Sequence, residues 1–322
     1  MRIRIAAALS AVAATALLLS GCAGAANPSA SPSPSASSSC LLDAKPGKAS
    51  DAVKVEGEGK DLKVTVPSGT DIDAATAVER TVVKKGDGKD VVAGDLVSVQ
   101  YRIVNAADSA LLDSSARGVD DQLPVLLDPN QQSLFVAALE CQPLGSSVVL
   151  ALPGKVMGEG QKAIVVYAQS TKALPTVATG KEVAPVEGMP TVKLDKDGAP
   201  EITIPKTDPP TATTIANLKQ GDGPTVQSGD YVIVQYRGVT WADGKEFDSS
   251  WKRKAPAQFQ TTGVVTGFKK ALEGQKVGSQ VLVVIPPAEG YGDQAQQSIP
   301  ANSTLVFVVD ILGTVPAAAP AQ

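Results

Sequence analysis

The sequence predicts an α+β protein made of two tandem units of one fold, each an antiparallel twisted sheet wrapped on one short helix. Two observations predict it. One long motif occurs twice along the 322 residues, and in each copy short alternating strands surround a single amphipathic helix. A chain of this length also suggests about two domains.

The internal repeat is clearest in the strand near the middle of each copy. The first copy has Ala93–Arg102 followed by Leu112–Ser115, and the second has Ser228–Arg237 followed by Phe247–Ser250. Both strands alternate and end in Gln-Tyr-Arg, a pattern typical of a central strand. The copies differ most where an apolar pocket needs aromatic walls, because only the second copy has a phenylalanine there.

Each unit is expected to begin with a short β-ribbon. The paired segments are Val53–Val55 with Leu62–Pro67 in the first unit and Val192–Leu194 with Glu201–Pro205 in the second. All four are short and alternate between apolar and polar residues, which favours strands.

One helix per unit follows from apolar residues spaced at i, i+3 and i+4. The second unit has this spacing over residues 268–272, and Gly274 is a helix stop. The first unit has the same spacing over residues 135–139, with Ser133 as an N-cap.

Further apolar strands complete each unit and define its limits. The strands lie at residues 148–150, 163–169, 281–283 and 304–312. The expected domains cover residues 40–170 and 191–313, the latter with a core at 213–313. Residues 171–190, rich in Pro, Thr and Val, are the expected linker, and residues 314–322 are an expected disordered tail.

Composition excludes several kinds of chemistry. Histidine is absent and the formal net charge is −4. Without histidine there is no Ser-His-Asp or Cys-His catalysis and no histidine metal site. The acidic balance argues against a nucleic-acid partner, which would require a basic patch.

The N-terminus has the features of an export signal and is excluded from the fold. Two arginines precede apolar residues 5–19, a stretch shorter than the about 20 residues of a membrane span. Leu19-Ser20-Gly21-Cys22 resembles a bacterial lipobox. That resemblance implies a signal peptide over residues 1–21, lipidation of Cys22, and an extracytoplasmic protein anchored to the bacterial cell membrane. An ordinary signal peptide cut elsewhere is the alternative.

The next segment is expected to be a tether. Residues 22–39 are rich in Ala, Ser and Pro and have little to bury, which favours disorder. Two cysteines remain, Cys40 and Cys141. In the oxidising environment outside the cell they favour one disulfide, which would hold the start of the first unit to the end of its helix. Two buried free thiols are the alternative.

The second unit resembles an FKBP-type peptidyl-prolyl cis-trans isomerase domain over residues 213–313. Each shared motif is short, but the motifs occur in the order typical of the family. They are Gly221-Asp222-Gly223, Tyr236-Arg237-Gly238, residues 243–250, Val264–Phe268, Leu272-Glu273-Gly274, Ile285-Pro286-Pro287, Tyr291-Gly292, Ile299-Pro300 and Leu305–Phe307.

The resemblance implies a proline-binding pocket in this unit. The residues it marks as catalytic are Tyr236, Phe247, Asp248, Val265 and Tyr291. The residues it marks as substrate-binding are Arg253, Val264, Phe268, Ile299 and Phe307. The chain departs from the family at Phe268, where the pocket floor is usually Trp, and at Ala257, where an aromatic residue is usual. We therefore expect a shallower pocket.

The chemistry that the resemblance implies needs no metal and no cofactor. Rotation about an X-Pro bond breaks no covalent bond, and its barrier of about 18–20 kcal/mol comes from amide resonance. A catalyst need only favour the twisted amide over the planar one, and an aromatic box that excludes water suits this task. The Val265 amide and the Tyr291 hydroxyl are the implied donors to substrate carbonyls. The expected partners are proline-containing exported polypeptides, bound by a monomer.

The first unit is expected to be a degenerate, inactive copy with a structural or partner-binding role. It keeps Tyr101 and Asp113. It has Leu112 where the second unit has Phe247, and Pro153–Met157 stand where the Tyr291 loop belongs.

Two other functions compete with isomerisation. In a non-catalytic binding protein both units would dock peptides or proteins, and Ala257 and Phe268 favour that alternative. A purely structural spacer in the cell envelope is the weaker one. Binding of an FKBP-directed macrolide together with an isomerase rate would separate the catalytic from the docking function.

Overall fold

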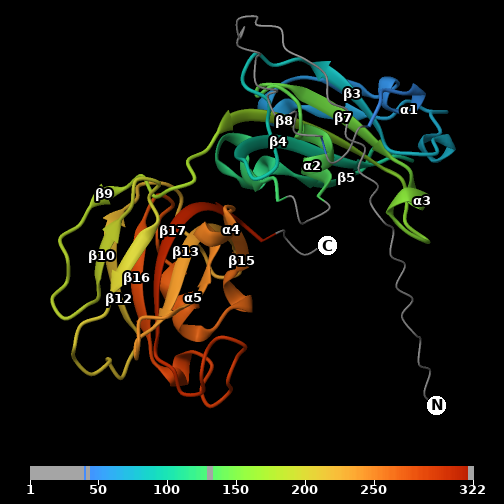
Figure 1. The fold of residues 1–322 in the computed structure, drawn as a ribbon. Coiled ribbons are helices and arrows are strands. Elements are labelled where there is room, and N and C mark those ends of the chain that lie inside the picture. Colours follow the sequence, from blue (N-terminus) through green and yellow to red (C-terminus); the bar gives the residue numbers. More distant parts are fainter. Residues whose placement is uncertain (1–39, 41–43, 129–132, 318–322) are drawn as a thin grey trace, which may run out of the picture. The chain divides into compact units, whose positions relative to one another are not determined.

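Two large antiparallel β-sheets, each packed against one main helix, dominate the described part of the chain, and each is accompanied by a two-stranded ribbon (Figure 1). In this computed structural model the described residues are 40, 44–128 and 133–317, and they belong to one compact unit. The predicted signal peptide, tether and lipidated Cys22 lie outside the described residues. Among the residues described, no helix is long and apolar enough to cross a membrane.

The first domain contains a six-stranded sheet in the order β3-β7-β8-β4-β5, with β6 also paired to β4, and a separate β1–β2 ribbon. Its strands are β1 (Lys54–Glu56), β2 (Lys63–Thr65), β3 (Glu79–Lys84), β4 (Leu96–Asn105), β5 (Leu111–Ser114), β6 (Leu123–Leu126), β7 (Ser147–Leu152) and β8 (Ile164–Ala173). Its helices are α1 (Lys48–Asp51), α2 (Leu134–Leu139) and α3 (Gly154–Met157).

The second domain repeats this plan with a seven-stranded sheet, β14-β13-β17-β16-β12-β9, in which β15 also pairs with β13, and a β10–β11 ribbon. Its strands are β9 (Lys181–Glu182), β10 (Thr191–Leu194), β11 (Pro200–Thr203), β12 (Thr214–Gln220), β13 (Tyr231–Thr240), β14 (Glu246–Ser249), β15 (Ala257–Gln260), β16 (Gln280–Ile285) and β17 (Leu305–Val315). Its helices are α4 (Ser250–Arg253) and α5 (Thr266–Leu272).

Six single 3-10 turns join these elements. They are η1 (Gly59–Asp61), η2 (Ile72–Ala74), η3 (Ser115–Arg117), η4 (Val119–Asp121), η5 (Thr261–Gly263) and η6 (Pro287–Glu289). The predicted ribbons, central strands and main helices are therefore all present.

Each main helix buries the apolar face that its spacing predicts. In α5, Phe268, Ala271 and Leu272 are buried against the sheet, and α5 lies on β16. Gly267 makes this close approach possible, because a Cβ there would lie 2.4 Å from Cγ2 of Ile285. In α2, the Ser133 side chain caps the first turn by accepting from the Phe135 amide, as predicted.

The segment expected to be a linker is partly structured. β8 continues to Ala173, and β9 adds a short edge strand to the second sheet by pairing with β12. The Ala178 amide donates to Asp310 Oδ2 at 2.9 Å, and Ala178 is buried. The expected tail also starts late, because β17 runs to Val315. A two-residue strand carries no periodic pattern, so these pairings were not predicted from the sequence.

The described residues include three further helices of a single turn, α1, α3 and α4, where one helix per unit was expected. Each has four residues, which is too short to display an amphipathic repeat. α4 matters for the site, because it contains Arg253, whose guanidinium binds Asp248 of β14.

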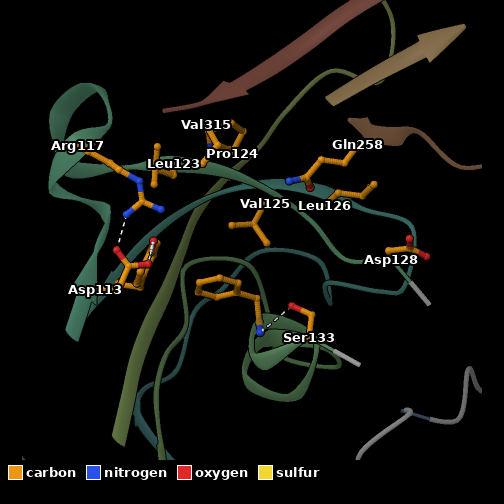
Figure 2. A pocket seen from close by; sticks show the side chains of 12 residues that line it. Asp113, Arg117, Leu123, Pro124, Val125, Leu126, Asp128, Ser133, Gln258 and Val315 are labelled. Atoms are coloured by element: carbon orange, nitrogen blue, oxygen red, sulfur yellow. Dashed lines mark hydrogen bonds and ion pairs between the residues drawn. The ribbon is translucent and has the colours of Figure 1, made fainter. Parts of the chain in front are cut away.

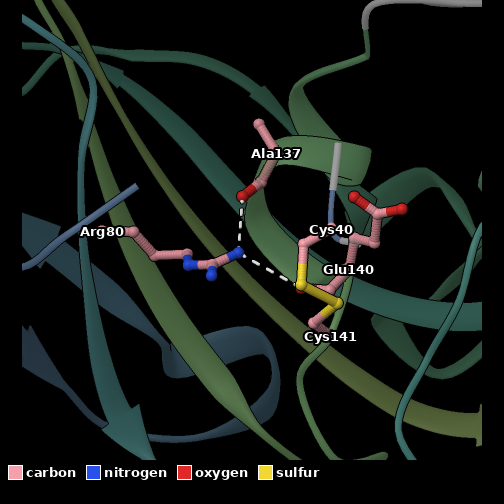
Figure 3. The surroundings of a disulfide bond; sticks show 5 residues. All are labelled: Cys40, Arg80, Ala137, Glu140 and Cys141. Atoms are coloured by element: carbon pink, nitrogen blue, oxygen red, sulfur yellow. Dashed lines mark hydrogen bonds between the residues drawn. A yellow bond between two sulfur atoms is a disulfide. The ribbon is translucent and has the colours of Figure 1, made fainter. Parts of the chain in front are cut away.

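The structure joins Cys40 to Cys141, directly after α2 (Figure 3). Arg80 reaches the same helix end, where its Nη1 donates to the carbonyl of Ala137 at 3.0 Å and of Glu140 at 3.2 Å. Cys141 has φ 58°, and Gly274 ends α5 in the same way with φ 83°. A cysteine therefore replaces the usual left-handed glycine in the first domain, and the disulfide together with charge-assisted hydrogen bonds from Arg80 holds that helix end.

Candidate active site

A cavity of about 520 Å³ opens between α5, β14 and the loop after β16 in the second domain. Nine of the ten residues predicted for the site line it, and only Arg253 lies just outside. The lining residues from the prediction are Tyr236, Phe247, Asp248, Val264, Val265, Phe268, Tyr291, Ile299 and Phe307. Phe259 and residues 296–298 also line it.

Aromatic rings form the walls and floor of this cavity. Phe307 stands between Phe268 and Phe247, with ring centroids 4.9 and 5.2 Å away, and the Tyr236 centroid is 5.6 Å from that of Phe259. Each of these pairs is close to edge-to-face, the arrangement that aromatic quadrupoles favour. Phe268, Phe307 and Tyr236 are buried, so they form a rigid apolar box rather than a loose surface cluster.

Gly238 makes room for two of these rings. A Cβ at this position would lie 2.6 Å from Cζ of Phe247 and 2.8 Å from Cε1 of Phe307. Real Cβ atoms do not approach other atoms so closely. A glycine in the middle of β13 weakens a strand, and here it makes space for the aromatic wall.

Three polar side chains close one edge of the cavity. The Tyr236 hydroxyl donates to Asp248 Oδ2, and Arg253 Nη1 donates to Asp248 Oδ1. Arg253 Nη2 also donates to the Tyr236 hydroxyl oxygen at 2.8 Å, and the guanidinium carbon lies 5.4 Å from the tyrosine ring centroid. The three groups satisfy one another and hold the carboxylate at the rim of the box.

Burial raises the pKa of Tyr236 to about 12. This value also includes the hydrogen bond to Asp248, which raises the pKa, and the hydrogen bond from Arg253, which lowers it. The phenol therefore stays protonated at any physiological pH and remains a donor to Asp248. It cannot act as a general base.

Local backbone contacts fix the acid. The Ser249 amide donates to Asp248 Oδ1 at 2.8 Å, and the Tyr236 amide donates to Ser250 Oγ at 2.7 Å. The Ser298 hydroxyl donates to the Phe247 carbonyl at 3.2 Å, which ties the polar loop of residues 293–298 to β14. The motif Phe247–Ser250 therefore positions a ring, a carboxylate and the start of α4 together.

The two predicted donors to substrate both line the cavity. Val265 directly precedes α5, and among the described residues its amide has no hydrogen-bond acceptor. Tyr291 lies after η6 in the loop between β16 and β17, and its side chain is 39% exposed. Both groups are free to donate to a bound ligand.

The first domain has a smaller cavity, of about 290 Å³, with the same polar edge (Figure 2). The Tyr101 hydroxyl donates to Asp113 Oδ2 at 2.9 Å, and Arg117 Nη1 donates to Asp113 Oδ1 at 2.5 Å. The Arg117 guanidinium carbon lies 6.0 Å from the Tyr101 ring centroid, and Phe135 packs on that ring at 4.8 Å.

The aromatic box is missing from the first domain. Ile103 pairs with Val166 across the sheet in the same way that Gly238 pairs with Phe307. Leu112, in the position of Phe247, is 55% exposed. Aliphatic side chains thus stand where the second domain has a glycine and two rings.

Sequence reasoning missed three residues of these sites. Gly238 belongs to a family motif but is not predicted to shape the pocket, Phe259 lies outside those motifs, and the sequence does not match Arg117 to Arg253. The signal for Gly238 was present in the repeat itself, since the first copy has isoleucine there. Arg117 lies one position earlier relative to its aspartate than Arg253 does, so simple alignment of the copies hides it.

The described residues contain no group of three or more His, Cys, Asp or Glu side chains placed to hold a metal ion. The cavity instead offers apolar rings, a fixed carboxylate edge and backbone donors. These features suit a protein that binds its ligand by shape and hydrogen bonding.

Comparison with known proteins identifies that class more closely. A family model for FKBP-type peptidyl-prolyl cis-trans isomerases matches residues 223–312. The FK506-binding protein of Streptomyces anulatus is 38% identical over 117 residues, which are 35% of this chain and 94% of that protein. A probable FK506-binding protein of Corynebacterium glutamicum is 34% identical over 113 residues, 35% of this chain and 96% of that protein.

The FKBP-type isomerase FkpA of Escherichia coli is 42% identical over 100 residues, which cover 31% of this chain and 37% of that protein. Its crystal structure aligns with a TM-score of 0.33 and 34% identity over 41% of this chain and 54% of that one. The crystal structure of the three FKBP domains of wheat FKBP73 aligns with a TM-score of 0.30 and 19% identity, over 76% of this chain and 98% of that one. TM-scores of this size carry no weight, so family membership rests on the sequence relatives.

The chain belongs to the FKBP-type peptidyl-prolyl cis-trans isomerase family. The predicted fold class and the predicted isomerase function are both confirmed. The family match lies in the second domain, where the aromatic box lies.

Proposed function

We propose that the second domain binds a proline-containing segment in its aromatic box and lowers the barrier to rotation of the X-Pro bond. The observation that carries this proposal is the cavity in which Phe247, Phe268 and Phe307 meet at near edge-to-face angles beside a fixed Asp248 edge. A planar amide is stabilised by resonance, which charges its carbonyl oxygen and attracts water. A box that excludes water removes this advantage of the planar form.

The fixed donors determine which atoms of the substrate are held. In the proposed complex the Val265 amide and the Tyr291 hydroxyl donate to backbone carbonyls on either side of the proline ring, which rests on Phe268. Holding the flanking carbonyls leaves rotation of the X-Pro bond as the remaining free motion. Each 1.36 kcal/mol by which the twisted amide is favoured accelerates isomerisation tenfold.

Tyr236 and Arg253 position the acid in this proposal. Asp248 is held by a neutral phenol and a guanidinium, so its side chain keeps a fixed position at the rim. Arg253 is half exposed, with 49% of its side-chain surface accessible, so its contribution is modest.

We also propose where the protein works. The lipobox-like sequence ending at Cys22 supports a lipoprotein anchored on the outer face of the bacterial cell membrane, and we propose that it acts as a monomer on exported proline-containing polypeptides. A diacyl or triacyl cysteine would supply the two lipid signals that stable anchoring needs. Replacing Cys22 with serine is expected to move the chain from the membrane fraction to the soluble fraction, and an unchanged distribution would contradict the anchor.

The catalytic proposal is tested with a protease-free assay, in which a proline-limited unfolded protein refolds in the presence of the full chain. The double variant Phe247→Ala plus Tyr291→Phe is expected to lower kcat/KM by about 100-fold, since it removes one wall and one donor. The matched control is Leu112→Ala, at the corresponding position of the first domain, which should leave the rate unchanged. Equal rates for wild type and the double variant would refute the site.

A further inference from the structure

The cavity of the first domain contacts the C-terminal end of the last strand. β17 ends at Val315, and Val315 packs against the apolar core of the first domain and forms part of the cavity wall (Figure 2). Arg117 Nε donates to the carbonyl oxygen of the next residue, Pro316, at 3.1 Å. A valine-proline segment of the chain itself therefore lies at the pocket that the first domain keeps.

The guanidinium of Arg117 divides its donors between the pocket and this segment. Nη1 donates to Asp113 Oδ1 at 2.5 Å and to the Ser114 carbonyl at 2.7 Å, while Nε donates to Pro316. The polar edge thus holds a carbonyl of a proline-containing segment with a charge-assisted hydrogen bond. Tyr101 and Phe135 line the same cavity and supply its apolar side.

The approach of β17 to β6 depends on two further features. Gly313 leaves room for Pro124, whose Cβ and Cγ would lie 2.9 Å from a Cβ at residue 313. Leu312 and Ile233 are buried in one cluster with Leu96 and Leu126. The strand end is therefore held by apolar packing as well as by the Arg117 hydrogen bond, and it reaches the cavity in an extended conformation.

We propose that the pocket of the first domain is a docking site for a proline-containing segment and that its resident ligand is the chain's own Val315-Pro316. The first domain has lost the ring walls that a catalyst needs but has kept the edge that grips a backbone carbonyl. It acts as an intramolecular clamp on the end of β17. This proposal does not depend on the isomerase function of the second domain.

An intramolecular ligand competes strongly with an external one. A short covalent connection gives an effective concentration in the millimolar range. An external peptide that saturates the free pocket at about 0.1 mM should therefore occupy it about tenfold less in the intact chain than in a chain without the docked segment.

The experiment uses a synthetic hexapeptide, Gly-Thr-X-Pro-Ala-Ala, in which X is photo-leucine, a diazirine amino acid close in size to valine. The peptide is photolysed with the full chain and with a chain ending at Thr314, and mass spectrometry locates the label. Labelling within residues 111–126 is expected to rise about tenfold on truncation. Val315→Asp in the full chain places a carboxylate near Asp113, and the two negative charges repel each other. This variant should therefore also raise the labelling of residues 111–126, without shortening the chain.

Paired arginine variants decide which pocket is responsible. In the truncated chain, Arg117→Ala is expected to abolish the gain in residues 111–126, whereas Arg253→Ala should leave that gain intact. Equal labelling of the full and truncated chains, or a gain that survives Arg117→Ala, would overturn the proposal. Because the readout is the position of the label and not a rate, its failure is distinguishable from failure of the isomerase proposal.

Discussion

The two domains share a polar pocket edge and differ in what stands behind it. In both, a tyrosine hydroxyl donates to an aspartate that an arginine also binds, and the same backbone turn holds the aspartate. Behind that edge the second domain has Phe247 and Phe307 packed over Gly238, while the first has aliphatic residues including Ile103. The polar edge thus occurs both with and without an aromatic box behind it.

This difference teaches which part of the site is needed for which task. The polar edge takes part in holding a backbone carbonyl without an aromatic box behind it, as Arg117 donates to Pro316. An X-Pro amide is favoured in its twisted form only where rings also exclude water. The loop that carries Tyr291 adds to the difference, since residues 286–304 join β16 to β17 whereas the shorter segment 153–163 joins β7 to β8.

The largest effect is expected from giving the second domain the residue of the first at the base of the box. In Gly238→Ile the new side chain must displace the rings of Phe247 and Phe307. We expect kcat/KM in the refolding assay to fall at least about 100-fold and the free energy of unfolding to fall by about 1–3 kcal/mol. The reverse change in the first domain, Ile103→Gly, should leave kcat/KM unchanged. Wild-type activity in Gly238→Ile would contradict the claim that the glycine makes room for the aromatic box on which catalysis depends.

The disulfide distinguishes the domains in stability. Replacing both Cys40 and Cys141 with serine should lower the free energy of unfolding of the first domain by about 2–4 kcal/mol, because the bond closes a long loop. The second domain ends α5 with Gly274 and should be unaffected. Calorimetry is expected to show one transition moving to lower temperature while kcat/KM stays constant. A variant with unchanged transitions would show that the bond does not stabilise the first domain.

A smaller effect is expected at the shared edge. Asp248→Asn removes the ion pair with Arg253, and both partners are about half exposed, so the loss is worth at most about 1 kcal/mol. That corresponds to a decrease of at most about fivefold in kcat/KM. Asp113→Asn is the matched change in the first domain and should have no effect on the rate. An equal decrease in both variants would mean that both pockets take part in catalysis.

The last prediction concerns the pH dependence of stability and not the rate. Burial raises the pKa of Tyr236 to about 12, above its ordinary value of 10, so the folded state binds the proton more tightly than the unfolded state. Stability from this group is fully present below about pH 10 and is lost as pH rises from 10 to 12. In denaturant titrations, Tyr236→Phe should have a shallower fall in the free energy of unfolding across that range. A parallel fall would assign the pH dependence to other groups.

Much of the fold was predictable because its elements have strong local patterns. The β-ribbons alternate, α2 and α5 have regular apolar spacing, and the repeat supports each assignment twice. The edge strand β9 was not predictable, because two exposed residues gain their strand conformation only from pairing with β12. The extension of β17 to Val315, where a disordered tail was expected, has a similar cause. Val315 is held by packing against the core of the first domain, which its local sequence does not reveal.

The sequence predicts those site residues whose chemical type determines their role. It does not predict a residue that matters because it lacks a side chain, or one that occupies a different position in the two copies. Phe268, Tyr236 and Asp248 follow from the motif. Gly238 contributes empty space, which becomes meaningful only when the rings beside it are placed. Arg117 reaches its aspartate from a 3-10 turn, whereas Arg253 does so from α4, so the two arginines do not align by position.

The most direct test of the central claim exchanges Leu112 and Phe247, the one residue by which the motifs Leu112–Ser115 and Phe247–Ser250 differ. Phe247→Leu and Leu112→Phe are each made in the full chain and compared with wild type in the protease-free refolding assay. We predict that Phe247→Leu lowers kcat/KM about tenfold, since one aromatic wall is lost, and that Leu112→Phe leaves it unchanged. Full activity in Phe247→Leu, or a large change in Leu112→Phe, would contradict the assignment of catalysis to the aromatic box of the second domain.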